Sequence, residues 1–297
     1  MQFTWQYQGA PIAMKRFLTN HGISMRTIKT VKHGTGAFVV NGQVQTGVIT
    51  INDGDVAGIR LPDEAADPLI AVSMQPLQVQ YEDANWLVVN KPAGLTSVPG
   101  PSNRTDTLVN RIKGYLVAMQ SANQRPHLIT RLDRDTSGLV LVAKHRVAQG
   151  MLTEPRLAAQ LIKTYLAWIV GKLPQASGVI DQPIGRIDDS PRRAVTTAGQ
   201  RAITKYRVEA DDLIHGVSRV RLELVTGRTH QIRVHLMAQG HPLLGDELYG
   251  GNQQWIQRQA LHAATLAFFD PFTEQTLQFT AALPVDLQAV NQSQKSH

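Results

Sequence analysis

The stretch Arg131-Leu132-Asp133-Arg134-Asp135-Thr136-Ser137-Gly138 decides the fold, and it runs directly into the apolar segment 139–143. A Thr-Ser-Gly turn that enters an uninterrupted apolar run is typical of a loop held at the start of a buried strand. Such a loop fixes a carboxylate on a rigid element, where a reacting group can meet it. Asp133 and Asp135 share a face only if the segment is extended. A charged turn is also common as an ordinary solvated loop, and the spacing alone leaves both interpretations open.

The length of 297 residues suits a small domain followed by a larger one, each able to bury a core. The hydrophobic share of 42% and the charged share of 18% are typical of globular proteins. No apolar segment approaches the roughly 20 residues that span a membrane, so we expect a soluble protein without a membrane partner. The segment 1–10 lacks the basic start and apolar core of a secretory signal, which favours a cytoplasmic location.

The chain contains no cysteine, which excludes disulfides, thiolate catalysis and cysteine zinc sites. Any chemistry must therefore rest on carboxylates, hydroxyls, histidines and cations. The 30 Lys and Arg residues exceed the 23 Asp and Glu residues, giving a net charge of +7. This balance favours a polyanionic partner such as nucleic acid, although many basic proteins bind no anion specifically.

A small N-terminal α/β domain is predicted over residues 12–62. Apolar residues at helical spacing indicate two short helices, the first ending near Gly22 and the second capped by Ser24. Short β-like runs follow, and Asn41-Gly42 is a strong hairpin signal. Basic side chains gather on or near the helices: Lys15, Arg16, Arg26, Lys29, Lys32 and His33. These side chains indicate RNA binding, or equally the solvated face of two surface helices.

Segment 63–76 is polar and rich in proline, which indicates a linker. The larger domain is predicted over 77–290. Its β-like runs outnumber its helical segments and do not alternate regularly with them. We therefore expect an α+β domain built on a large mixed, mainly antiparallel sheet.

Two further segments carry candidate functional side chains. Lys163-Thr164-Tyr165 opens a strand, and Tyr165 offers an aromatic face to an unstacked base as well as a hydroxyl group; it is equally typical of a core tyrosine. In segment 226–236 a glycine turn and Thr229 precede a helix. Free backbone N–H groups at the start of this helix, together with Arg228, could bind an anion. The alternative is a plain helix start with a surface arginine.

No cofactor or metal motif is found. His230, His235 and His241 do not form a His-Glu-x-x-His pattern, and no carboxylate lies among them. A phosphate loop of the Gly-x-x-x-x-Gly-Lys type and a dinucleotide fingerprint are both missing from the sequence. We therefore expect neither metal nor cofactor.

The chain resembles the RluA-type pseudouridine synthases, which convert uridine in RNA to its carbon-linked isomer. The resemblance rests on the 131–138 motif, Lys163-Thr164-Tyr165, Gly227-Arg228-Thr229-His230-Gln231 and the segments 90–94 and 240–246, in the order of that family. It covers about 77–287 and implies the pseudouridine synthase fold. Residues 12–62 resemble the small αL-type RNA-binding domain of a ribosomal protein and several RNA-modifying enzymes.

The resemblance assigns a role to each candidate residue. It implies that Asp133 is the nucleophile, that Tyr165 lies against the target base and that Arg228 pairs with Asp133. Residues expected to contact substrate are Arg131, Lys163, Arg233 and Leu244. Isomerisation transfers no group and changes no redox state, so no cofactor is needed. The appended domain favours ribosomal RNA of the large subunit as substrate over transfer RNA, and we expect a monomer.

Two alternatives remain open from the sequence. A non-catalytic RNA-binding or ribosome-assembly protein on the same scaffold would need only the basic charge and the small domain. An aspartate-dependent glycosidase acting on small substrates would release free base or sugar and would respond little to salt.

Overall fold

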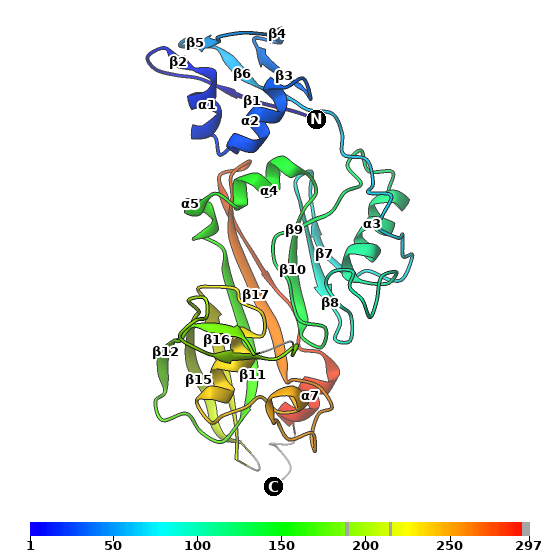
Figure 1. The fold of residues 1–297 in the computed structure, drawn as a ribbon, viewed down its shortest axis with the longest axis vertical. Helices are drawn as coiled ribbons and strands as arrows, with labels where there is room; N and C mark the ends of the chain where they lie inside the picture. Colours follow the sequence, from blue (N-terminus) through cyan, green and yellow to red (C-terminus); the bar gives the residue numbers. More distant parts are fainter. Residues whose placement is uncertain (188–189, 214–215, 293–297) are drawn as a thin grey trace.

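The computed structural model describes residues 1–187, 190–213 and 216–292. They form a small N-terminal unit with a four-stranded sheet and a large unit with a ten-stranded sheet (Figure 1). The small unit, drawn in blue, lies at one end of the long sheet beside α4 (Arg146–Leu152) (Figure 1). No helix in these three ranges combines the length and apolar character needed to cross a membrane.

The small unit contains the two predicted helices and a sheet of order β1-β6-β3-β4. Its elements are β1 (Gln2–Gln6), β2 (Ile12–Ala13), α1 (Met14–Asn20), α2 (Met25–Lys32), β3 (Ala37–Val40), β4 (Gln43–Gln45), β5 (Thr50–Ile51) and β6 (Val56–Arg60). Ser24 caps α2, since its side chain accepts the N–H of Thr27 at 3.1 Å. Strand β1 pairs antiparallel with β6, so the sheet begins ten residues before the expected start at Ile12.

The large unit is built on a sheet of order β12-β15-β16-β11-β17-β10-β8-β7, with β18 on β17 and β9 on β10. Its elements are β7 (Val79–Glu82), β8 (Trp86–Lys91), α3 (Leu108–Ala118), β9 (His127–Leu128), β10 (Ser137–Ala143), α4, α5 (Pro155–Ala158), β11 (Ile162–Val170), β12 (Ser177–Asp181), β13 (Ile184–Arg186), β14 (Arg193–Val195), β15 (Ile203–Leu213), β16 (Val217–Leu224), α6 (Gln231–Ala238), the 3-10 helix η1 (Glu247–Tyr249), β17 (Leu261–Asp270), β18 (Gln275–Thr280) and α7 (Val285–Gln292). Among these strands the β10–β17 pair is parallel and its neighbours in the sheet are antiparallel. The predicted mixed, mainly antiparallel sheet is confirmed.

Strand β10 fixes the 131–138 motif at the centre of the large sheet. Its seven residues are all buried, as the apolar run predicts. Gly138 has φ +114°, and a Cβ atom there would lie 2.2 Å from the carbonyl oxygen of Ala263 on β17. Only glycine fits this approach. The turn before β10 is therefore held where β10 and β17 meet.

Helix α4 joins the two units. Its Val147 and Met151 belong to the same buried cluster as Phe17 and Ile28 of the small unit. Gly22 lies against the side chain of Met151. The two units therefore share a core at this point.

Segment 63–76, predicted as a linker, is packed against the large unit. Glu64 is 4% exposed and accepts hydrogen bonds from Nε of Arg146 and Nε2 of His127. Ser73 is also buried, and its hydroxyl donates to Asp106 at 2.7 Å. The polar, proline-rich composition predicted a linker, and these side chains make specific bonds to the large unit.

Candidate active site

A cavity of about 440 Å³ opens where the turn before β10 faces the start of β11. Its walls come from the segments 96–98 and 129–134, from β11, and from the turn between β16 and α6. Five residues predicted for catalysis or substrate binding line it: Arg131, Asp133, Lys163, Tyr165 and Arg228. A smaller cavity of about 50 Å³ shares several of these residues and reaches the first turn of α6. The structure thus brings together segments that lie far apart in the sequence.

An ion pair joins Asp133 to the first turn of α6. Nη1 of Arg233 donates to Oδ2 of Asp133 at 3.3 Å. The same guanidinium donates to both carboxylate oxygens of Asp246, at 2.7 Å each, and is nearly buried. Burial lowers the pKa of Arg233, but Asp246 and Asp133 outweigh it and raise the pKa above its ordinary value. A permanent cation therefore lies beside Asp133.

In this structure the ion-pair partner of Asp133 is Arg233, whereas the sequence led us to expect Arg228. Nε of Arg228 donates instead to the carbonyl oxygen of Arg201 at 3.1 Å, and Arg228 lies exposed on the cavity wall. The position at which helix α6 begins explains why Arg233, rather than Arg228, meets Asp133. His230 takes the left-handed conformation with φ +58°, so α6 begins at Gln231 and its first turn directs Arg233 inward.

The loop that carries Asp133 is held by buried polar side chains. The hydroxyl of Ser97 donates to the carbonyl of Leu132 at 2.6 Å and accepts its N–H at 3.1 Å. Nζ of the fully buried Lys91 donates to the carbonyl of Arg134 at 2.9 Å. Burial lowers the pKa of Lys91 to about 7. These contacts keep the loop rigid.

Asp135 has a different environment from Asp133. It forms an ion pair with its neighbour Arg134 at 3.0 Å, and it does not line either cavity. Because the segment is a turn rather than a strand, the two carboxylates diverge. Of the two, Asp133 alone faces the cavity.

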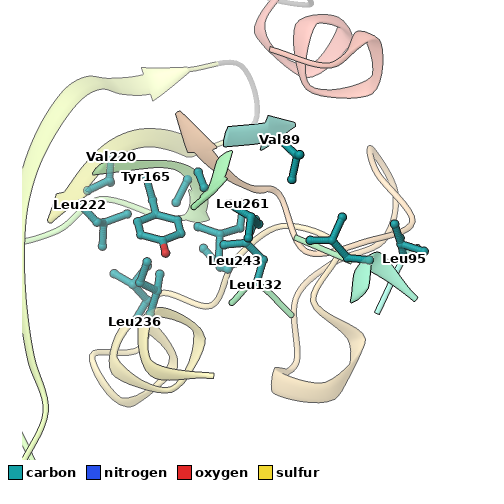
Figure 2. Close-up of a cluster of buried hydrophobic side chains, with 14 of the residues drawn as sticks. Val89, Leu95, Leu132, Tyr165, Val220, Leu222, Leu236, Leu243 and Leu261 are labelled. Atoms are coloured by element: carbon teal, nitrogen blue, oxygen red, sulfur yellow. The ribbon is translucent and has the colours of Figure 1, made fainter. Parts of the chain in front are cut away.

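Tyr165 and Lys163 lie two apart on β11, and both line the larger cavity. Tyr165 is 5% exposed, and Figure 2 shows its ring among the buried side chains of Leu222, Leu236 and Leu261. Burial, and then the charge of Asp133, raise the pKa of Tyr165, so its phenol stays protonated. Burial also lowers the pKa of Lys163. Tyr165 is both a core tyrosine and a cavity residue.

Leu244 does not lie in the cavity, which corrects its assignment as an apolar contact of the base. It packs with Trp168, Ile256 and Leu287 in a separate cluster. Its N–H donates to the carbonyl of Trp168 at 2.9 Å, which places it beyond the cavity along β11. The aliphatic side chains that line the two cavities are instead those of Val98, Ile129, Leu132, Leu224, Ile232 and Leu261.

The basic residues predicted in the small unit are all exposed: Lys15, Arg16, Arg26, Lys29 and Lys32. Arg26 and Lys29 line a shallow surface hollow of about 570 Å³ together with Met25 and His33. A cationic helix face is therefore exposed beside the side chain of Met25.

The three histidines near α6 have separate structural partners. His230 bonds to Oη of Tyr249, His235 to Thr204, and His241 to the carbonyl of Val170. No group of three metal-ligating side chains occurs in the part of the chain that the structure describes. These histidines hold secondary structure elements together.

Sequence reasoning missed several residues that support Asp133. Asp246 lies in the segment 240–246, which contributes to the family resemblance without a role of its own, and the ring centre of Tyr249 lies 4.9 Å from Cζ of Arg233. A carboxylate that ends the Gly-x-x-x-x-Gly-Asp run could have signalled a partner for a buried arginine.

Sequence comparison relates the chain to known proteins. A family model described as RNA pseudouridylate synthase matches residues 85–238. The chain is 39% identical over 281 residues to the uncharacterized RNA pseudouridine synthase YjbO of Bacillus subtilis, covering 93% of this chain and 97% of that one. It is 39% identical over 229 residues to the ribosomal large subunit pseudouridine synthase D of Yersinia pestis, covering 71% and 69%.

The fold is also similar to a solved structure. Human RNA pseudouridylate synthase domain containing 1 superposes with a TM-score of 0.59 at 27% identity, over 73% of this chain and 89% of that one.

Proposed function

Because the chain belongs to the RNA pseudouridylate synthase family, we propose that Asp133 is the nucleophile with which it isomerises uridine in large-subunit ribosomal RNA. The protein is an RNA pseudouridine synthase, an isomerase. The observation that carries the proposal is the position of Asp133, which faces a cavity between Tyr165 and the guanidinium of Arg233.

The reaction breaks the bond between N1 of uracil and C1′ of ribose, turns the base and joins C5 to C1′. C5 loses its proton and N1 gains one, so substrate and product contain the same atoms and no cofactor is consumed. A carboxylate can form a covalent intermediate with the base or with the ribose after the first bond breaks and before the second bond forms. Arg233 holds Asp133 in place for this attack.

The target uridine must leave its stack to reach the cavity, which costs roughly a few kcal/mol. In the proposal the ring of Tyr165 packs against the base, while Arg131, Lys163 and Arg228 contact the nucleotide from the cavity wall. Stacking and phosphate contacts offset the cost of flipping.

Two observations support large-subunit ribosomal RNA as the substrate. Several similar proteins carry the name ribosomal large subunit pseudouridine synthase D. The small unit presents Lys15, Arg16, Arg26, Lys29 and Lys32 on exposed helices, as the proposed RNA-binding domain requires. By this proposal, residues 2–62 hold the ribosomal RNA while the large unit modifies it.

A deletion strain tests the proposal. Large-subunit RNA isolated from it should lack one or more pseudouridines, and a plasmid copy of the wild-type gene should restore them. The Asp133→Asn variant should not restore them, whereas the matched Asp135→Asn variant should. If deletion leaves every large-subunit pseudouridine in place but removes one from transfer RNA, the substrate assignment fails while the activity stands.

A further inference from the structure

We propose that a pocket beside the active-site cavity binds one backbone phosphate of the RNA, next to the nucleotide that is isomerised. This inference rests on the proposed function in taking RNA as the ligand. The pocket, here called the arginine pocket, has a volume of about 320 Å³ and lies between the β13–β14 hairpin and the turn before α6. Its charged lining residues are Arg186, Arg193 and Arg228.

The hairpin places two of these arginines directly opposite each other. Arg186 and Arg193 are partners in the antiparallel register of β13 and β14, so both side chains leave the same face. Like charges in this position destabilise a strand pair. Among the described residues that line the pocket, none is Asp or Glu. An anion in the pocket would remove the repulsion.

Another pair of opposed arginines shows the contrast. Arg207 and Arg221 are partners in the register of β15 and β16, but there Glu209 accepts a hydrogen bond from Arg221. The protein therefore supplies a carboxylate where the arginines have a structural role. In the arginine pocket none of the described lining side chains is a carboxylate, so a bound anion can take that position.

Neutral carbonyl groups of the described residues orient two of these arginines, Arg193 and Arg228. Nη1 of Arg193 donates to the carbonyls of Pro191 and Arg192, and Nε of Arg228 donates to the carbonyl of Arg201. Carbonyl acceptors fix a guanidinium but leave its charge and its other N–H groups available. Planar guanidinium groups match the geometry of phosphate oxygens.

The pocket is held at a fixed place relative to Asp133. Arg228 and Thr229 line both the arginine pocket and the active-site cavity. The N–H of Arg193 donates to Oη of Tyr249 at 2.9 Å, and the ring of Tyr249 lies against the guanidinium of Arg233. A phosphate in the pocket would therefore belong to a nucleotide adjacent to the target.

Salt dependence tests the inference. The experiment measures kcat/KM on a large-subunit ribosomal RNA transcript over a range of NaCl concentrations. The proteins compared are wild type, Arg186→Gln, Arg193→Gln and the control Arg207→Gln. The slope of log kcat/KM against log salt should flatten by about 0.7 to 0.9 in each pocket variant, as expected for one lost phosphate contact. The control slope should stay at the wild-type value. Equal slopes in all four proteins would overturn the proposal.

A second experiment identifies the bound group. A short RNA that contains the mapped target uridine is made with one linkage at a time replaced by an uncharged methylphosphonate. At one flanking linkage, neutralisation should weaken wild type but leave Arg193→Gln unaffected. Equal losses in wild type and variant at every linkage would contradict phosphate binding. Failure of wild type to modify any transcript would instead count against the proposed function.

Discussion

Arg233 and Asp246 form a two-point hydrogen-bonded pair, 2.7 Å at each contact, and this pair fixes where the remaining nitrogen of Arg233 meets Asp133. Asp246 is fully buried, so it stabilises the guanidinium in a place where an unpaired cation would be costly. The ring of Tyr249 packs on the same guanidinium. The position of Asp133 thus depends on a residue 113 positions further along the chain, by the difference of the two numbers.

Replacing Arg233 by lysine should remove most activity. A lysine cannot contact both oxygens of Asp246 and also reach Asp133, because it lacks the planar fork of arginine. We expect kcat to fall about 10²- to 10³-fold, as for loss of one charge-stabilising donor. Single-turnover pseudouridine formation measures it. The matched Arg228→Lys variant should lose less than about tenfold, and the reverse order would show that Arg228 is the functional partner.

Replacing Tyr165 by phenylalanine separates packing from chemistry. The ring fills the same space, so the thermal midpoint should stay close to the wild-type value. If the hydroxyl moves a proton during the reaction, kcat should fall about 10²- to 10⁴-fold. Steady-state kinetics with a circular dichroism melt as control gives both values. Unchanged kcat would restrict Tyr165 to packing against the base.

Stability should depend on Glu64 in acid. Burial raises the pKa of Glu64, but His127 and Arg146 outweigh burial and hold the pKa at about 2, below its ordinary value of 4.5. A depressed carboxyl pKa stabilises the folded state above pH 4.5, and this contribution is lost as the pH falls towards 2. Glu64→Gln should therefore lower the free energy of unfolding by about 2–3 kcal/mol near neutral pH. The loss should become progressively smaller as the pH falls below 4.5.

Urea denaturation of wild type and Glu64→Gln, at neutral pH and at several acidic pH values, measures this difference. The neighbouring Asp63→Asn variant is the control, since Asp63 pairs at the surface with the N-terminal amine and should cost less than about 1 kcal/mol. A Glu64 difference that stays constant across the pH series would contradict the assigned pKa.

Gly138→Ala should disrupt the junction of β10 and β17. The new Cβ would lie 2.2 Å from the carbonyl oxygen of Ala263, and the backbone conformation is one that alanine rarely adopts. Gly227→Ala is the matched control, because among the described residues, its chain neighbours aside, no heavy atom lies within 4 Å of the place that its new methyl group would take. A thermal melt should show a large drop for the first variant and little change for the second. Equal melting points would mean that the strands can shift apart.

The local motifs were predictable because they depend on residue type and spacing. The apolar run after Ser137 predicted β10, Ser24 predicted the start of α2, and the 131–138 motif predicted a loop that presents Asp133 to a cavity. Each of these features is decided within a few residues. The mixed sheet followed from the order of β-like runs.

Long-range contacts were not predictable in the same way. Arg228 and Arg233 belong to one motif, and the choice between them depends on the left-handed backbone at His230, which no local pattern announces. An apolar side chain such as Leu244 suits both the active-site cavity and the cluster that contains Trp168. Tertiary packing places it in that cluster. Strand β1 is only five residues long, and its place in the sheet depends on its pairing with β6 and on the packing of Phe3 and Trp5 against the core of the small unit.

The most direct test of the central claim uses purified protein and an unmodified large-subunit ribosomal RNA transcript. Pseudouridine is mapped after incubation with wild type, Asp133→Asn and Asp135→Asn. The account predicts that wild type and Asp135→Asn form pseudouridine at the same uridine and that Asp133→Asn forms none while still binding the RNA. Full activity of Asp133→Asn would contradict the assignment of Asp133 as the nucleophile.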